Sequence, residues 1–188
     1  MVQKNEAVQM LMASGLKHLM LKYPFEKITI KMITDEAKIV RPTFYHYFQD
    51  KYELLEWIFE KEIIDTVKLV SEHGLSSDTL RLFFSLLEKD RLFYQKAFEV
   101  TGQNAFERIV NEHIYKLFLE RLHDVKLVPQ KYPKLLTPEA IARYHALGLV
   151  NMIKLWLFEA PDDATIDDVT EAYFFMLSHT LFDLVDQK

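Results

Sequence analysis

The chain has 188 residues and a mass of 22.3 kDa; 49% of its residues are hydrophobic, 27% are charged, and none is cysteine. A chain of this length buries about 70% of its unfolded surface on folding, which argues against a disordered protein. Without cysteine it can hold no disulfide, thiolate zinc site, iron–sulfur cluster or thiol nucleophile. The net charge is −5, but residues 1–55 carry 8 Lys and Arg against 6 Asp and Glu and are mildly positive.

Apolar residues recur mainly at three- and four-residue steps, and only 4 glycines and 6 prolines interrupt them, which favours an all-α protein. The first helix has an apolar stripe that ends at Pro24. Thr29 is a suitable N-cap for a second, short helix that ends near Ala37. A third short helix begins at Arg41-Pro42, because proline is tolerated in a first turn, and ends near Phe48.

The remaining helices follow from their capping residues. Asp50 with Glu53 three residues later is typical of a capping box and predicts a longer helix that reaches Ile63. Ser76, Thr137 and Thr165 are further N-caps. The periodicity predicts helices over residues 78–99, 103–124, 138–159 and 166–186. No run of 18 apolar residues occurs, and the chain opens on a mixed helix pattern, so we expect an unprocessed, cytoplasmic protein without a membrane span.

The last two predicted helices are apolar over much more than one face. A helix of this kind needs partners on several sides, and one subunit of this size has few to offer. We therefore expect these helices to form a homodimer interface. The residues predicted for it are Leu149, Ile153, Trp156, Phe175 and Phe182.

Three short helices, the second and third separated by a tight turn, form the layout of a helix-turn-helix over about residues 28–48. The third helix would enter the major groove of DNA while Phe44 and Phe48 face the core. The donors and aromatic surfaces predicted to contact DNA from it are Arg41, Thr43, Tyr45, His46 and Tyr47. Lys51, at the start of the next helix, is predicted to bind a phosphate, and Thr29 and Lys31 are expected to reach phosphates as well.

The run Thr43-Phe44-Tyr45-His46-Tyr47-Phe48, followed by Lys51, closely resembles the N-terminal domain of TetR-family transcriptional regulators, and the likeness covers about residues 5–65. It implies a helix-turn-helix domain over 1–65 and a helical ligand-sensing and dimerisation domain over 66–188. Family members often have glycine in the turn and serine as the cap of the recognition helix, whereas this chain has Lys38 and Val40. The Phe93–Phe98 segment and the late aromatic residues loosely resemble the subset that regulates dihydroxyacetone kinase operons.

Other chemistry has little support in the sequence. Glu120 and His123 form one E-x-x-H pair, whereas a di-iron bundle needs two such pairs and further carboxylates. His113, His145 and His179 lie in apolar helices and are interpreted as core or interface residues, although any of them could line an effector pocket. No phosphate-binding glycine loop or serine nucleophile motif occurs, so we predict no catalytic residue, metal or cofactor.

We therefore expect a homodimeric regulator, a repressor rather than an activator, that binds a palindromic operator in double-stranded DNA. An unknown small-molecule effector or a protein co-regulator would act on the C-terminal domain, within residues 75–188. The alternatives are a helical ligand-binding module or an enzyme without DNA binding, and a helical scaffold protein.

Overall fold

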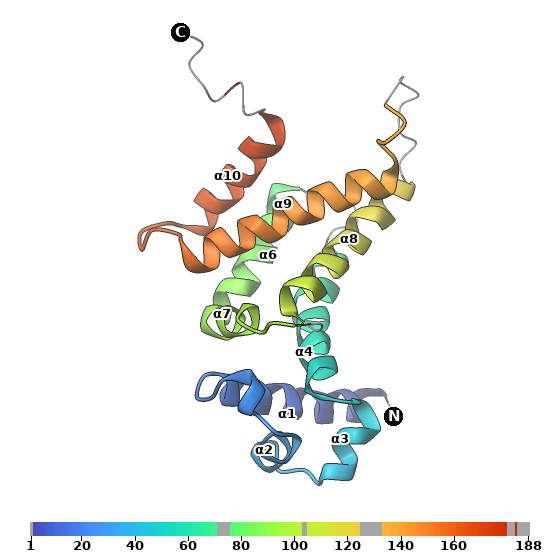
Figure 1. Cartoon of the computed structure of the whole chain (residues 1–188), viewed down its shortest axis with the longest axis vertical. Helices are drawn as coiled ribbons and strands as arrows, with labels where there is room; N and C mark the ends of the chain where they lie inside the picture. Colours follow the sequence, from blue (N-terminus) through green and yellow to red (C-terminus); the bar gives the residue numbers. More distant parts are fainter. Residues whose placement is uncertain (1, 71–75, 103–104, 125–132, 180–182, 184–188) are drawn as a thin grey trace. The chain divides into compact units, whose positions relative to one another are not determined.

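The computed structural model describes residues 2–70, 76–102, 105–124, 133–179 and 183, without the side chains of residues 2–5 and 123–124. Over these residues the chain is helical with turns and contains no strand, which confirms the all-α prediction (Figure 1). The elements are α1 (Val2–Met20), η1 (Phe25–Lys27), α2 (Ile30–Glu36), α3 (Arg41–Tyr47), α4 (Lys51–Phe59), η2 (Glu60–Ile64), α5 (Asp65–Val70), α6 (Ser77–Lys89), α7 (Arg91–Phe98), α8 (Phe106–Asp124), α9 (Pro138–Phe158) and α10 (Ile166–Ser178).

Side-chain caps begin several helices where the sequence predicted them. The Thr29 hydroxyl accepts from the Met32 N–H, and Thr137 and Thr165 cap α9 and α10 in the same way. Asp50 accepts from two backbone N–H groups at the start of α4. The predicted capping box differs in one detail, because the Glu53 carboxylate accepts from the Gln49 N–H rather than from the cap residue.

The predicted helix over 78–99 is two helices, because the chain turns at Asp90 between α6 and α7. The helix after Asp50 continues beyond Ile63 to Val70, and η2 within it is a single π-helical turn. The last described helix ends at Ser178, and most of the predicted extension to 186 lies outside the described residues.

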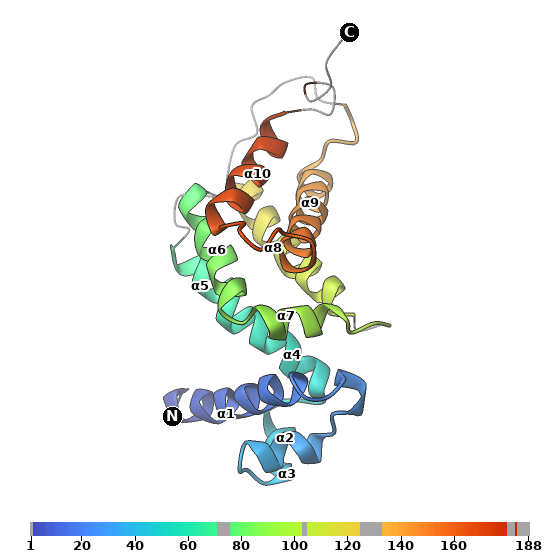
Figure 2. The same cartoon turned by 90° about the vertical axis from the view of Figure 1, so that its left-hand side faces the viewer.

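The chain divides into two compact units, each described here by itself. The first consists of residues 1–65 and 90–110. Figures 1 and 2 both show α2 and α3 next to each other on one side of α1. The predicted division after residue 65 would assign 90–110 to the second domain. The structure packs this segment on the first unit, because the Phe59 ring meets Tyr94 and Phe106 edge-on in the core.

The second unit consists of residues 66–89 and 111–188, as far as they are described. α10 packs on α6 and α9, and Arg81 of α6 forms an ion pair with Asp167 of α10. One face of α9 supplies much of the core through Leu149, Ile153 and Trp156. Within the described parts of the chain, no helix is both long and apolar enough to span a membrane.

Candidate DNA-binding surface

The turn between α2 and α3 is held by carbonyl groups of α2. The N–H of Lys38 donates to the Asp35 carbonyl, and the N–H of Ile39 donates to the Thr34 carbonyl, at 3.2 and 3.0 Å. Lys38 adopts φ of +55°, the left-handed conformation that favours glycine and costs other residues about 1–2 kcal/mol. α3 then begins after Val40, which makes no side-chain capping bond. Both departures from the family pattern are therefore accommodated without changing the start predicted for α3.

α3 has one apolar and one polar face. Phe44 and Phe48 are buried with ring centroids 5.8 Å apart, and Phe48 also meets the Trp57 ring of α4 at 5.9 Å. This confirms that both phenylalanines face the core. Arg41, Tyr45 and His46 are exposed, whereas Thr43 and Tyr47 are half-buried. The buried face fixes α3 on its unit. The opposite face is accessible to a partner such as the groove of a DNA duplex.

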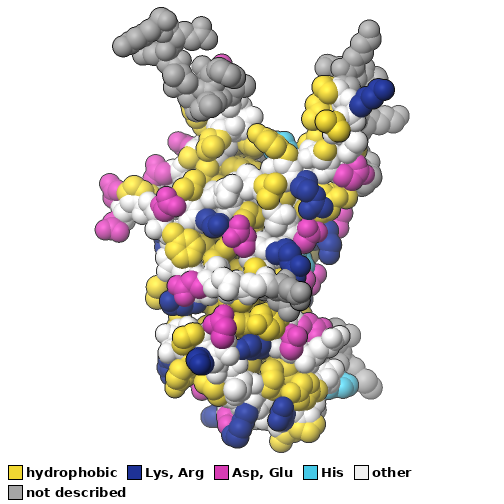
Figure 3. Space-filling view, viewed as in Figure 1, with side chains coloured by type: hydrophobic (Ala, Val, Ile, Leu, Met, Phe, Trp, Pro, Cys, Tyr) yellow, Lys and Arg dark blue, Asp and Glu magenta, His cyan; other side chains and the backbone are white. Residues whose placement is uncertain are grey.

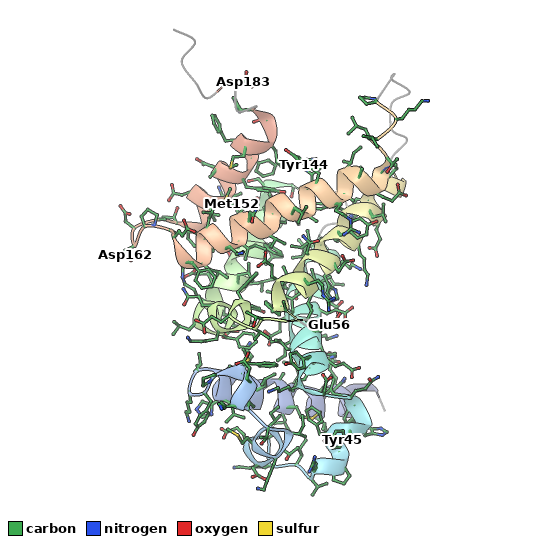
Figure 4. The ribbon with its side chains drawn as sticks, in the orientation of Figure 1. Tyr45, Glu56, Tyr144, Met152, Asp162 and Asp183 are labelled. Atoms are coloured by element: carbon green, nitrogen blue, oxygen red, sulfur yellow. The ribbon has the colours of Figure 1, made fainter. Side chains whose placement is uncertain are left out.

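The exposed face of α3 is ordered by contacts among its own side chains. The Arg41 guanidinium donates to the Tyr45 hydroxyl at 3.0 Å and lies 5.4 Å from the centroid of the Tyr45 ring. Tyr45, labelled on α3 in Figure 4, remains 49% exposed. His46 meets the Tyr47 ring at 4.9 Å in an edge-on arrangement. The arginine and the tyrosine form a preorganised pair of donor groups on the helix surface.

α2 adds polar groups to the same end of the first unit. Lys31 is highly exposed, and its ammonium pairs with Asp35 one turn later at 2.5 Å. The Thr29 oxygen already accepts the Met32 N–H at 3.2 Å, but its hydroxyl can still donate to a phosphate. Figure 3 shows Lys and Arg side chains beside hydrophobic ones at this α2–α3 end.

Lys51, predicted to bind a phosphate, donates hydrogen bonds within the chain in the DNA-free structure. Its Nζ donates to the carbonyl oxygens of Phe25, Ile28 and Glu26 at 2.6, 2.9 and 3.2 Å, and the side chain is half-buried. Burial lowers the pKa of the Lys51 ammonium, and this effect outweighs the opposing charges of Glu26 and Asp50. Because an ammonium has three N–H donors, a phosphate would have to displace one of these carbonyls.

An ion cluster that no sequence pattern indicated joins three segments of the first unit. Lys17 of α1 reaches both oxygens of Glu62 at 2.7 and 3.0 Å and one oxygen of Asp90 at 2.6 Å. The two carboxylates lie on η2 and at the start of α7, 45 and 73 residues along the chain from Lys17. Burial, followed by the charges of Glu62 and Asp90, raises the pKa of Tyr94 well above its ordinary value and keeps the phenol protonated.

The residues predicted for a dimer interface fall into three groups. Leu149, Ile153 and Trp156 are buried inside the second unit, so their apolar character is explained by its core. Phe175 of α10 is about half exposed, and Phe182 lies outside the described residues. The sequence predicted that this helix is apolar on more than one face, but the interface residues chosen from it do not lie on the apolar face that the structure leaves exposed. That face carries Tyr144, Leu147, Leu155 and Phe158.

A cavity of about 190 Å³ lies between α8, α9 and α10 in the second unit. Its lining is almost entirely apolar in area and includes Phe118, Leu122 and Ile141, with Arg121, His145 and Tyr173 as the residues that carry polar groups. Burial lowers the pKa of His145 and raises the pKa of Tyr173 to about 12, so both side chains are neutral near pH 7. Of the three histidines predicted as core or interface residues, His113 is buried, His145 half-buried and His179 exposed.

Among the described residues, no group of three or more histidine or acidic side chains could hold a metal ion. Glu120 of the E-x-x-H pair forms an ion pair with Lys68 at 3.3 Å. The His123 side chain lies outside the described residues.

Two family models match the chain. Residues 15–58 match "Bacterial regulatory proteins, tetR family", and residues 76–163 match "Transcriptional regulator C-terminal region". The chain is 32% identical over 130 residues to the HTH-type dhaKLM operon transcriptional activator DhaS of Lactococcus lactis, an alignment that spans 69% of this chain and 66% of that protein. The chain thus aligns with just under two thirds of the length of this relative.

Solved structures have the same fold. A dihydroxyacetone kinase operon activator DhaS is 24% identical, with a TM-score of 0.61 and coverage of 90% of this chain and 93% of that one. NalD, the secondary repressor of the MexAB-OprM multidrug efflux pump in Pseudomonas aeruginosa, is 19% identical, with a TM-score of 0.56 and coverage of 92% and 94%. At these identities the likeness establishes the fold alone.

Proposed function

Since the chain belongs to the TetR family of bacterial regulatory proteins, we propose that it regulates transcription by inserting α3 into the major groove of an operator. Proteins of this family are regulators and not enzymes. The observation that carries the proposal is the two-sided α3, with Phe44 and Phe48 buried and the Arg41–Tyr45 pair exposed. We place the protein in the cytoplasm, where an operator would be available to it.

The proposed contacts divide into positioning and reading roles. A major groove about 12 Å wide admits a helix, and arginine or polar side chains on it can donate to base edges. Arg41, Tyr45 and His46 are the exposed candidates for base contact, with the half-buried Thr43 and Tyr47 at their sides. Thr29 and Lys31 on α2 are proposed to donate to phosphates, which fixes the register of α3 without reading sequence.

We propose that the exposed apolar face of α9 binds a second copy of the chain. The exposed residues of this face are Tyr144, Leu147, Leu155 and Phe158. They are separated by three, eight and three positions, so they lie on one side of the helix. A two-fold dimer presents the same patch from both subunits, so this surface would be buried against itself. Phe175 of α10, also exposed, is the remaining candidate from the predicted interface.

An effector is proposed to bind the second unit. The cavity between α8, α9 and α10 fits a small, apolar molecule, and the neutral His145 could exchange one hydrogen bond with it. A protein co-regulator is the other partner that the sequence predicted. Either one must bind the DNA-competent and the incompetent arrangements of the dimer with different affinity.

The direction of regulation is a separate question. Repression was expected from the sequence, the relative at 32% identity is an activator, and NalD is a repressor. The proposed DNA-binding surface of α3 is compatible with both outcomes. A promoter fusion in cells with and without the chain would measure the direction.

DNA binding is tested by mobility shift and footprinting on the segment upstream of the chain's own gene. The proposal predicts protection of two half-sites about one helical turn apart, 34–36 Å, or a multiple of that spacing, as a two-fold dimer requires. Binding without any preference over unrelated DNA, or protection of one isolated half-site, would contradict it.

A further inference from the structure

Arg41 is the first residue of α3, and the first turn of a recognition helix is the part whose side chains contact base edges. Its side chain is exposed, and among the residues that the structure describes no carboxylate pairs with its guanidinium. Lys31 of α2 differs, because its ammonium pairs with Asp35. The positive charge of Arg41 is therefore available to a partner outside the chain.

The orientation of this guanidinium is set by Tyr45, one turn further along α3. Side chains on a helix lean toward its N-terminus, so residue 45 lies over residue 41. The Arg41 Nη2 donates to the Tyr45 hydroxyl at 3.0 Å, and its Cζ lies 5.4 Å from the centroid of the tyrosine ring. The Tyr45 ring in turn meets the ring of the buried Phe44 edge-on at 5.7 Å. A series of contacts therefore connects the core of the first unit to the guanidinium.

The donors that remain on Arg41 match one base. A guanidinium has five N–H groups in one plane, and the bond to Tyr45 uses one of them. In the major groove guanine presents two neighbouring acceptors, N7 and O6, to which an arginine donates two hydrogen bonds. Adenine presents the N7 acceptor beside an N6 donor, cytosine presents a donor, and thymine presents a single acceptor. Only guanine accepts both bonds.

We propose that Arg41 determines specificity by reading a guanine in each half-site of the operator, and that the Tyr45 hydroxyl positions the guanidinium for this contact. A side chain that is already held in one orientation loses less conformational freedom on binding, so the pair strengthens the preference for guanine. The exposed Tyr45 ring can contact the groove as well. The inference rests on the proposed insertion of α3 into the major groove and adds the base that is read.

The wild-type protein provides the first test, on the operator that footprinting identifies. Each base pair of one half-site is replaced in turn, and mobility shifts measure the affinity. At least one G·C pair should be required, with a loss of about 5- to 150-fold when A·T replaces it, the range that 1–3 kcal/mol of discrimination produces. 7-Deazaguanine, which lacks the N7 acceptor, should also lower affinity at that position. A half-site without any guanine requirement would overturn the proposal.

Two variants of Arg41 then assign the guanine to its reader. Arg41→Ala should bind G·C and A·T at that position about equally and should be insensitive to 7-deazaguanine. Arg41→Gln should shift the preference there from guanine toward adenine, whose N6 and N7 glutamine contacts. Lys31→Gln is the matched control, because it also removes one positive charge; it should weaken binding to every duplex and keep the guanine preference. A guanine preference retained in either Arg41 variant would overturn the reading role.

Tyr45→Phe tests the positioning role, because it keeps the ring and removes only the hydroxyl that Arg41 contacts. It should reduce the guanine preference at this one position, leave the other positions unchanged, and cause no further loss of that preference when combined with Arg41→Ala. Tyr23→Phe, at another exposed tyrosine of the first unit, should leave every position unchanged. An undiminished guanine preference in Tyr45→Phe would overturn the positioning role.

The results also separate this inference from the proposed function on which it rests. A wild type that binds no duplex with preference contradicts both. A sequence preference that does not depend on Arg41 contradicts the inference alone and leaves the proposed function intact.

Discussion

Replacing Lys17 by methionine should destabilise the first unit, because the ion cluster joins three segments that are distant in sequence. The substitution keeps most of the apolar stem and removes the ammonium that both carboxylates contact at 2.6–3.0 Å. The side chains of Lys17, Glu62 and Asp90 are 17%, 24% and 34% exposed, so the cluster lies between surface and core. Exposed pairs contribute about 0.2–1 kcal/mol, and breaking a buried pair costs about 3–5 kcal/mol. We expect a loss of about 1.5–3 kcal/mol in the free energy of unfolding.

Urea denaturation followed by circular dichroism measures this loss, with Lys22→Met as the control at an exposed lysine on the turn after α1. Adding Glu62→Gln to Lys17→Met should recover part of the loss, since one of the two abandoned carboxylates is then neutral. A coupling energy of about 1 kcal/mol between the two substitutions is expected for a contact of this kind. Equal, small losses for Lys17→Met and Lys22→Met would refute the reasoning.

Three further predictions concern packing, assembly and pH. Gly15→Ala should stabilise the protein by about 0.5–1 kcal/mol in urea, because α1 gains helix propensity and an added Cβ would make ordinary contacts with the Ile33 carbonyl at 3.4 Å and with the Ala37 nitrogen and the Glu36 Cβ at 3.5 Å. Gly15→Leu should destabilise it. Leu155→Glu should shift sedimentation from dimer to monomer at a concentration where Leu92→Glu, at another exposed leucine, remains dimeric. The Thr165 bonds lower the pKa of Asp168 below its ordinary value of 3.8, so this cap stabilises α10 above that pH and is lost as pH falls through the lowered pKa. Asp168→Asn should remove that acid-sensitive part of the unfolding curve, and an unchanged pH dependence would contradict the assignment.

Local patterns predicted the helices well, because caps and apolar periodicity act over a few residues. Thr29, Asp50, Thr137 and Thr165 begin helices as expected, and Phe44 and Phe48 lie inside. The break at Asp90 was missed because the apolar pattern continues across it. In the structure α6 ends at Lys89, and the Asp90 carboxylate at the break binds Lys17 of α1.

Residue type alone could not show which charged side chains find hydrogen-bond partners within the chain, or which apolar side chains are buried in its own core. Lys51 is predicted to bind a phosphate, and in the DNA-free structure its ammonium donates to carbonyls 23 to 26 residues earlier. Trp156 looked like an interface residue, yet it is buried in the core of its own unit. α9 is apolar on two faces, and only the burial of its side chains in the structure shows which face remains exposed. The sequence could predict α3 as the DNA-contacting helix because one of its faces is apolar and the other is polar.

The central claim is that the exposed face of α3 reads DNA sequence. Its most direct test compares Tyr45→Ala with Tyr23→Ala, because both tyrosines belong to the first unit and are similarly exposed, at 49% and 46%. Mobility shifts measure the affinity of each variant for the footprinted operator and for a random duplex. Loss of a base contact costs about 1–3 kcal/mol of discrimination, so Tyr45→Ala should lower the ratio of operator to random affinity by about 5- to 150-fold. Tyr23→Ala should leave that ratio unchanged. Equal losses on both duplexes for Tyr45→Ala, or no loss at all, would contradict the claim.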